Sequence, residues 1–254
     1  MKMTINTGPE ALLSHLQNAD GSATFSYAGY TVVGAVNGPI EVQRRDELPE
    51  EAVVDVIVRP AAGVGGTRER HLESLIQSTL RQIILINNFP RTLIQVILQV
   101  TTAPENEYVN AKTVQASSNL PLLPALLQTA VLSLLSAALP LTTTLTSTSL
   151  AIIADGQSNK IVLNPSPREV ETSQSFHVFS FTSHDEPILV ESEGSFTMKE
   201  WDDAFAAAQR QCCQSTIIND GDTRMDDSNS ADANLKQFTR STLEGKIASD
   251  LHWK

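Results

Sequence analysis

The residues best suited to bind an anion lie in a glycine-rich loop that precedes a predicted helix. The segment Gly63-Val64-Gly65-Gly66-Thr67-Arg68-Glu69-Arg70 combines backbone amides with two arginines. Amides at a helix N-terminus attract phosphate, and guanidinium groups strengthen the attraction. The segment has neither the Gly-Lys-Ser/Thr of a Walker loop nor the spacing of a dinucleotide-binding loop. Two interpretations stay open: a phosphodiester contact at Arg68 or Arg70, or a flexible loop with Thr67 as the helix cap.

A third candidate arginine begins a predicted strand. In Phe89-Pro90-Arg91-Thr92 the proline favours an extended conformation at Phe89, so Arg91 is expected to enter the strand in a defined direction. There it can bind a phosphodiester or form a surface salt bridge. The sequence Arg44-Arg45-Asp46-Glu47, by contrast, is expected to compensate its own charges.

The other reactive side chains do not assemble into a catalytic or metal-binding set. The five histidines lack metal-ligand spacing, no nucleophile elbow occurs, and the two cysteines are not in a CxxC arrangement. We therefore predict no catalytic residue, no metal site and no cofactor. His177 lies in an alternating strand and is interpreted as a core-edge residue. Cys212 and Cys213 are adjacent, cannot form a normal structural bridge, and indicate a reducing compartment.

Composition limits the classes of protein that these residues can serve. The chain has 254 residues, 41% of them hydrophobic and 19% charged, which is enough for a full core and excludes a disordered or collagen-like protein. A net charge of −11 opposes an autonomous nucleic-acid binder, because affinity for phosphates scales with the lysines and arginines presented to them. Any contact with RNA or DNA must come from a local basic patch.

One long apolar segment could be a membrane span or a buried helix. No charged residue occurs between Lys112 and Asp155, and 120–141 is dominated by leucine and alanine. Three prolines, four polar residues and the lack of basic anchors oppose a transmembrane helix. A helix that is apolar all round is also typical of the centre of a large core, and we predict that arrangement here.

Periodicity and turn signals predict the elements that position these residues. Strands are expected at 23–25, 30–36 (closed by Asn37-Gly38-Pro39), 52–58, 92–100 (buried on both faces), 175–182 and 188–191, with a hairpin of 143–154 and 160–163. Helices are expected at about 67–87, 122–138 and 197–217, the last capped by Thr197 with Glu200. The predicted organisation is a compact domain at 1–218, an acidic flexible linker at 219–234 and a C-terminal extension at 235–254 that could be helical.

Five short segments, in this order and spacing, resemble the RNase PH family. They are Ala19-Asp20-Gly21-Ser22-Ala23, Gly38-Pro39-Ile40-Glu41, Arg59-Pro60, Phe89-Pro90-Arg91-Thr92 and Gln95 to Gln99, within a match that covers Leu12 to Thr216. Asn37 to Glu41 and Val56 to Pro60 look most similar to a subunit of the eukaryotic exosome ring. The resemblance implies an α+β, RNase PH-like two-layer fold, ribosomal protein S5 domain 2-like, with a left-handed βαβ unit and mixed sheets packed on helices.

The resemblance also allows a test for catalytic activity. Active members carry a Gly-Thr-Arg phosphate motif after the strand that here ends near Val100, but the matching stretch from Asn119 to Leu123 has no cation and no glycine. Gly66-Thr67-Arg68 spells the motif one helix too early, so we do not assign it this role. Two family aspartates, six residues apart, fall at Asn164 and Val170. Since valine can neither carry charge nor donate a proton, the resemblance implies a non-catalytic subunit.

The resemblance further implies a place in a six-membered ring through which RNA is threaded for 3′–5′ processing and degradation. Expected partners are the other exosome ring subunits, with ribosomal RNA-processing protein 43 as a neighbour, the exosome cap subunits, and RNA in the central channel, with no membrane. In related rings the loop before the first helix lines the pore, so Arg68 and Arg70, together with Arg91, are the expected RNA-binding residues. The expected location is the nucleus and nucleolus, and also the cytoplasm.

Two alternatives from other classes stay open. The chain could be an active phosphate-dependent or metal-dependent 3′–5′ exoribonuclease, against which the residues at Asn164 and Val170 argue. It could also be a homo-oligomeric protein that binds nucleic acid outside the exosome.

Overall fold

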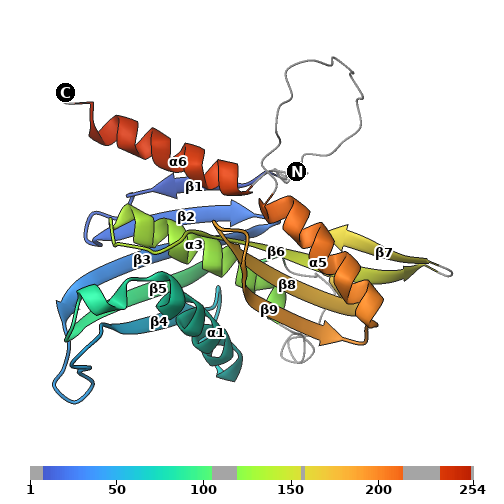
Figure 1. Cartoon of the computed structure of the whole chain (residues 1–254), viewed down its shortest axis with the longest axis horizontal. Coiled ribbons are helices and arrows are strands. Elements are labelled where there is room, and N and C mark those ends of the chain that lie inside the picture. The colour runs from blue at the N-terminus through green and yellow to red at the C-terminus, as the bar shows by residue number, and fades with distance from the viewer. Residues whose placement is uncertain (1–7, 105–118, 156–157, 214–234, 253–254) are drawn as a thin grey trace.

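The computed structural model describes residues 8–104, 119–155, 158–213 and 235–252. These residues form two β-sheets and five α-helices (Figure 1). The first sheet has the order β1-β2-β3-β5-β4, and the second has the order β7-β6-β8-β9. Mixed helices and sheets of this kind agree with the α+β class expected from the sequence.

The first sheet is antiparallel except for its last pair of strands. It consists of β1 (Glu10–Leu13), β2 (Gly21–Tyr27), β3 (Tyr30–Glu41), β4 (Val53–Arg59) and β5 (Thr92–Thr102). Strands β4 and β5 run parallel, and helix α1 (Thr67–Ile83) makes the crossover between them. Because β4 ends where α1 begins, the glycine-rich loop and the start of α1 lie at the C-terminal edge of this parallel pair.

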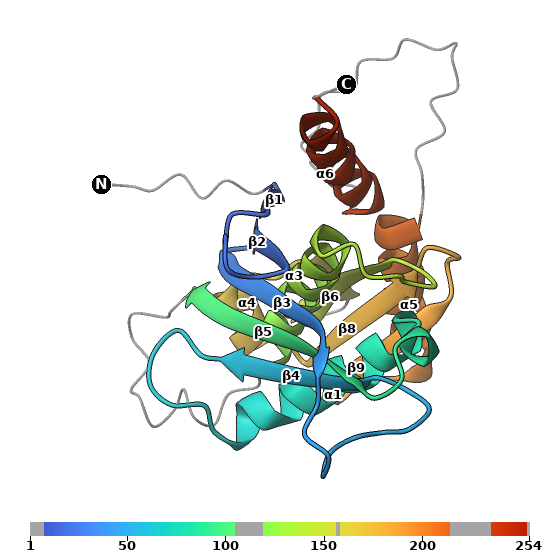
Figure 2. The same cartoon turned by 90° about the vertical axis from the view of Figure 1, so that its left-hand side faces the viewer.

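The apolar segment forms helix α3 (Leu123–Ser136), which follows the 3₁₀ turn η2 (Leu120–Leu122). Every residue of α3 except Leu135 is buried, because the helix packs against β2 and β3 on one side and β6 on the other (Figure 2). The prediction of a buried central helix is confirmed. No helix in the described parts of the chain is long and apolar enough to cross a membrane.

The second sheet is antiparallel throughout and comprises β6 (Leu145–Asp155), β7 (Ser158–Leu163), β8 (Ser175–Thr182) and β9 (Pro187–Gly194). Helix α5 (Met198–Cys213) packs on the face turned away from α3 and encloses a second apolar cluster around Phe179 and Phe181. The short helix α4 (Pro167–Thr172) follows β7. At the start of α5, Glu200 accepts a hydrogen bond from the Thr197 N–H at 2.6 Å, as the predicted capping box requires.

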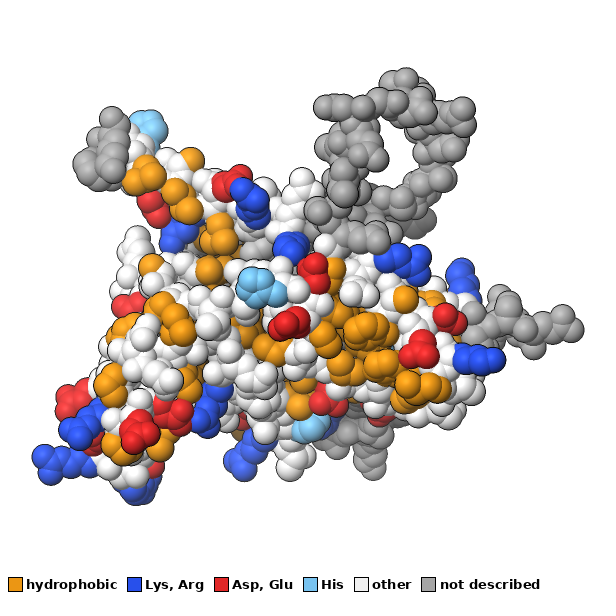
Figure 3. Space-filling view, viewed as in Figure 1, with side chains coloured by type: hydrophobic (Ala, Val, Ile, Leu, Met, Phe, Trp, Pro, Cys, Tyr) orange, Lys and Arg blue, Asp and Glu red, His pale blue; other side chains and the backbone are white. Residues whose placement is uncertain are grey.

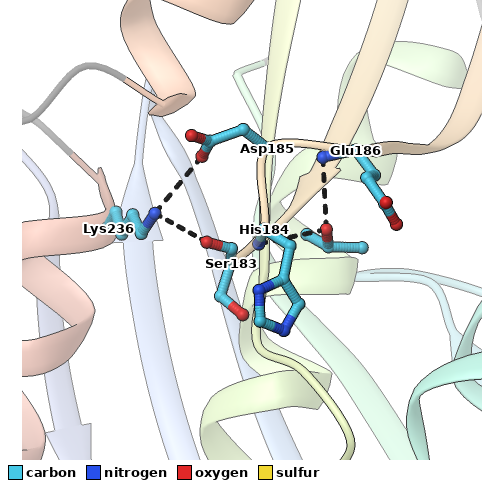
Figure 4. A network of polar contacts seen from close by, with 6 residues as sticks. Ser183, His184, Asp185, Glu186 and Lys236 are labelled. Carbon is cyan, nitrogen blue, oxygen red and sulfur yellow. Dashed lines mark hydrogen bonds and ion pairs between the residues drawn. The ribbon is translucent and has the colours of Figure 1, made fainter.

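The C-terminal segment forms helix α6 (Leu235–Asp250), which lies beside β2 and α3 (Figure 1). The Phe238 ring packs 6.1 Å from that of Phe25, and Gln128 donates a buried hydrogen bond of 2.7 Å to the Thr239 hydroxyl. At its N-terminal end, Lys236 binds the Ser183 carbonyl at 2.8 Å and the Asp185 carboxylate at 3.3 Å (Figure 4). Apolar packing on β2 and hydrogen bonds to α3 and to the β8–β9 turn therefore both hold α6 against the rest of the protein.

Two sequence predictions for the first sheet are wrong. Strand β3 does not close at Asn37-Gly38-Pro39 but continues to Glu41, because a register shift between Asn37 and Ile40 lets pairing with β5 resume. Strand β5 is buried on only one face, with Ile94, Val96, Leu98 and Val100 inward. Helices α1 and α3 both cover that face, so the other face stays half-exposed. The predicted linker at 219–234 lies outside the described residues.

Candidate nucleic-acid interface

The glycine-rich loop presents an exposed approach to helix α1. Residues 61–67 are all exposed, and α1 begins at Thr67 with Gly66 as its N-cap residue. The Glu69 carboxylate, at the third helical position, accepts a hydrogen bond of 2.6 Å from the Gly66 N–H. The interpretation of Thr67 as the cap is therefore wrong. The N-cap is Gly66, whose N–H is bonded by the Glu69 carboxylate, and Thr67 is the first helical residue.

Arg68 connects the starts of two helices. Its guanidinium donates a hydrogen bond to the Asn119 side-chain oxygen, and the Asn119 amide lies 3.5 Å from Glu69 Oε1 as a donor. Asn119 directly precedes η2 and α3. The N-termini of α1 and of the η2–α3 segment therefore meet at one half-buried arginine.

This contact changes the interpretation of Gly66-Thr67-Arg68. The triplet begins α1, one helix before the stretch from Asn119 to Leu123 in which the resemblance places the phosphate motif. Its arginine nevertheless reaches the first residue of that stretch through space. Sequence reasoning missed Asn119, although an asparagine just before Leu120-Pro121 is a typical residue for a helix start.

Arg70 and Arg91 lie at opposite ends of the parallel strand pair formed by β4 and β5. Arg70 is exposed in the first turn of α1, near Arg68. The parallel pair of β4 and β5 runs from Val53 opposite Leu93 to Arg59 opposite Gln99. At about 3.3 Å per residue, those pairs are about 20 Å apart. Arg91 precedes the first pair and α1 follows the last, so the structure brings Arg68 and Arg70 together but leaves Arg91 at the opposite edge.

Arg91 is engaged with the loop between β3 and β4. Its backbone adopts a left-handed conformation (φ 60°), and its N–H donates to the Leu48 carbonyl at 3.2 Å. Its guanidinium lies 3.2 Å from Glu47, with the arginine side chain 69% exposed. The surface salt bridge anticipated as one interpretation is therefore present, and an exposed pair of this kind contributes about 0–1 kcal/mol.

The two positions at which the resemblance expects aspartates hold no acid. Asn164 has a left-handed backbone (φ 48°), and its amide donates to the Tyr27 hydroxyl at 2.7 Å, which joins the end of β7 to the β2–β3 hairpin. Val170 lies in α4 and packs against the larger apolar core. Its neighbour Glu169 caps α4 by accepting 2.7 Å hydrogen bonds from the Ser166 N–H and hydroxyl, and these bonds lower the pKa of Glu169.

The side chains of His177, Cys212 and Cys213 are not activated for catalysis. His177 is fully buried rather than at the core edge, with its ring nitrogens 2.8 Å from the Ser192 hydroxyl and 3.0 Å from that of Ser175. Burial lowers the pKa of His177 and raises those of the Cys212 and Cys213 thiols to about 12 and about 11, so neither thiol is an activated nucleophile. In the parts of the chain that the structure describes, no three His, Cys, Asp or Glu residues form a group that could hold a metal.

Comparison with known proteins agrees with this architecture. Residues 10–140 match domain 1 of the 3′ exoribonuclease (RNase PH) family, and residues 144–211 match its domain 2. The boundary falls between α3 and β6, so each match contains one of the two sheets.

The individual relatives are components of exosome complexes. The chain is 30% identical to exosome complex component RRP46 of Saccharomyces cerevisiae over 218 residues, which cover 83% of this chain and 92% of the yeast protein. It is 42% identical to exosome complex component rrp46 of Schizosaccharomyces pombe over 85 residues, or 34% of this chain and 38% of that protein. The crystal structure of rice Rrp46 superposes with a TM-score of 0.70 at 23% identity, covering 93% and 95% of the two chains. With both of its sheets matched, the chain belongs to the RNase PH family of 3′ exoribonucleases.

Proposed function

We propose that this chain is a non-catalytic subunit of an exosome core ring, which scaffolds the complex and lines the path of RNA for 3′–5′ processing and degradation. Its similarity to the exosome component of Saccharomyces cerevisiae over 83% of the chain, and to that of Schizosaccharomyces pombe over 34%, supports ring membership. The proposed partners are the other ring subunits, with ribosomal RNA-processing protein 43 as a neighbour, and the cap subunits. The proposed location is the nucleus and nucleolus, and also the cytoplasm.

The observation that carries the non-catalytic role is the way in which the two aspartate positions are occupied. Neither Asn164 nor Val170 carries a carboxylate. The Asn164 amide donates to Tyr27 and the Val170 side chain packs against the core, so both side chains have a structural role instead. Metal-assisted attack on a phosphodiester needs ligands for the metal, and phosphorolysis needs fixed charge around the transferring phosphoryl group. Arg68, which contacts Asn119, supplies a cation, but the two family aspartate positions add no metal ligand and no carboxylate to it.

The RNA-path role rests on Arg68 and Arg70 at the start of α1. Two arginines beside exposed loop amides suit a phosphodiester backbone, which needs positive charge but no base-specific reading. Arg91 is proposed as a separate contact because it lies at the other edge of the parallel strand pair. Its engagement with Glu47 leaves the guanidinium largely exposed.

A nuclease assay tests the non-catalytic role. The purified chain is incubated with a single-stranded RNA, phosphate and Mg²⁺, alone and in rings reconstituted with the other core subunits. We expect no shortening of the RNA that depends on this chain. Processive decay that survives in the chain alone, and is lost in an Asn164→Ala variant, would show that the chain is an active exoribonuclease.

Native mass measurement tests ring membership and the homo-oligomer alternative. We expect the chain to join a hetero-oligomer when the other ring subunits are present. A stable homo-oligomer that does not exchange with those subunits would contradict the proposal.

Arg91→Ala separates two roles for the isolated arginine. Intact rings with reduced RNA crosslinking would assign Arg91 to RNA, whereas fewer rings at every salt concentration would assign it to an interface. If neither quantity changes, Arg91 is a surface arginine and its assignment as an RNA-binding residue is wrong.

A further inference from the structure

Strand β9 forms an open edge of the second sheet. It pairs with β8 on one side, and among the described residues no strand lies on its other side. Among the described residues, its backbone hydrogen bonds are all with β8 or the adjoining turn, in a register from Ser175 opposite Gly194 to Ser180 opposite Leu189. An edge strand presents a row of N–H and C=O groups that can pair with another extended chain.

The corresponding edge of the first sheet is protected by side chains of α1. Glu73 accepts a hydrogen bond of 2.8 Å from the Val58 N–H, and Gln77 donates one of 2.6 Å to the Val54 carbonyl. These contacts occupy backbone groups of β4 that a further strand would need. Strand β9 has no such side-chain contact among the residues that the structure describes, so the two edges differ in their availability.

An exposed apolar surface borders β9 on the side of α5. Val190 is opposite Phe179 in the ladder and therefore faces the α5 side, where it is 39% exposed. Phe196, 40% exposed, packs its ring 4.8 Å from His177, and Met198 at the start of α5 is 70% exposed. Figure 3 shows hydrophobic side chains gathered around α5 and the strands beside it. Contiguous exposed apolar surface is typical of an interaction site.

The other face of β9 carries negative charge. Glu191 and Glu193 alternate with Val190 and Ser192 and lie opposite Val178 and Phe176 in the ladder. Like charges on adjacent strands are destabilising, so pairing of β9 with β9 of a second copy would bring these carboxylates together at an energetic cost. Lysine or arginine at alternate positions of a different strand would compensate them instead.

We propose that the edge of β9 is a docking site for an extended basic segment of a different protein. The segment would add a strand to the second sheet through main-chain hydrogen bonds, the mode of recognition called β-augmentation. Its basic side chains would face Glu191 and Glu193, and its apolar side chains would lie against Val190 and Phe196. This inference concerns the chain by itself and holds whether or not the ring role is correct.

Hydrogen exchange on the full chain tests the proposal with a defined probe. The probe is a synthetic peptide of the length of β9, 8 residues, with alternating lysine and valine, and its counterpart has alternating glutamate and valine. At saturation we expect the lysine peptide to slow amide exchange in 187–194 by about tenfold and the glutamate peptide to leave it unchanged. Equal slowing in β1, at the other edge of the first sheet, would mean non-specific attraction to an acidic protein and would overturn the proposal.

A charge reversal provides the matched control. Glu191→Lys with Glu193→Lys should abolish the response to the lysine peptide and create one to the glutamate peptide. Glu41→Lys with Glu50→Lys makes the same change of net charge at exposed residues of the first sheet and its following loop, and should leave the response as in the wild type. Glu191→Gln with Glu193→Gln serves if the reversal unfolds the chain, and should weaken binding of the lysine peptide.

Two further outcomes would contradict the proposal. An unchanged response in both Glu191/Glu193 variants would show that these carboxylates do not select the partner. Concentration-dependent protection of 187–194 in the absence of peptide would identify a second copy of the chain as the occupant.

Discussion

At the scale of single residues, the hydrogen bond from Arg68 to Asn119 places the Arg68 guanidinium at the start of the η2–α3 segment. The two residues are 51 positions apart, and neither has a neighbour in sequence that reveals the contact. Glu69 strengthens the arrangement because its carboxylate bonds Gly66 and lies near the Asn119 amide. Arg68 is thereby positioned by two helix starts, whereas Arg70 is exposed beside it.

Arg68→Ala with Arg70→Ala should weaken RNA protection by the reconstituted ring while ring assembly survives. The reason is the loss of two cations at the start of α1, next to the exposed loop of residues 61–67. The measurements are nuclease footprinting of RNA and native mass on the same preparation. Arg44→Ala with Arg45→Ala removes the same charge from another exposed loop and should leave protection unchanged. Loss of assembly in the Arg68 and Arg70 variant alone would mark them as interface residues.

His177 predicts a pH dependence of stability. Burial lowers the pKa of the folded imidazole below its ordinary value of 6.5, so the folded protein holds it neutral while the unfolded chain binds a proton first. The stabilisation is complete above pH 6.5 and is lost as the pH falls from 6.5 toward the lowered folded value. Urea unfolding at a series of pH values should show this decline in the wild type and a shallower one in His177→Gln. Parallel curves for the two proteins would assign the decline to other groups.

At the scale of elements, local sequence patterns were sufficient to predict the bounds of some helices and strands. The bounds of others depend on pairing between strands. The prediction of β8 matches the structure at both ends, and α3 differs by a residue or two, because their apolar runs are bounded by clear turns. Strand β1 and helix α4 have only 4 and 6 residues, too few to show a periodicity. The continuation of β3 past Pro39 depends on its register with β5, which lies about 50 residues away in sequence and leaves no local signal.

The candidate site was predictable in its parts but not in its arrangement. The types of Arg68, Arg70 and Arg91 indicate anion binding, and the sequence shows each of them directly. Their division between two edges of the sheet follows from the parallel pairing of β4 and β5, which no residue type specifies. The same holds for Asn164, whose engagement with Tyr27 joins the two sheets across a separation of 137 residues.

Helix α6 should contribute to the stability of the first sheet through one ring. Phe238 is half-buried against the larger core, so Phe238→Ala should lower the free energy of unfolding by about 1–2 kcal/mol. Ile247, on the same helix, is 55% exposed, and Ile247→Ala should change stability by less than about 0.5 kcal/mol. Chemical denaturation measures both. Equal effects of the two substitutions would mean that α6 does not dock through Phe238.

At the scale of the whole molecule, the charge distribution allows the chain to contact RNA at a few arginines but opposes strong binding of RNA by the chain alone. The net charge is −11, and the arginines proposed to meet RNA lie at two distant edges. Several phosphate contacts in one place are needed before counterion release gives strong binding. A ring can collect such contacts from several subunits around one pore, which a single acidic subunit cannot do.

The isolated chain should therefore bind single-stranded RNA poorly at physiological salt. Fluorescence anisotropy with a labelled oligonucleotide near 0.15 M salt should give no saturable binding below about 1 µM, since few phosphates can be neutralised at once. Lowering the salt should strengthen the interaction only slightly, because the slope of affinity against salt follows the number of phosphate contacts. A sub-micromolar Kd at 0.15 M salt would contradict the argument from net charge.

The docking of α6 has a consequence for the order in which this protein matures during synthesis. Gln128 in α3 finds its hydrogen-bond partner at Thr239, and the Ser136 carbonyl at the end of α3 finds Lys246, both more than a hundred residues later. While residues 235–246 are still inside the ribosome, the emerged sheet and α3 lack these partners, and the surface around Phe25 lacks its cover. A nascent chain paused before this point would expose polar and apolar groups together, the condition under which chaperones engage.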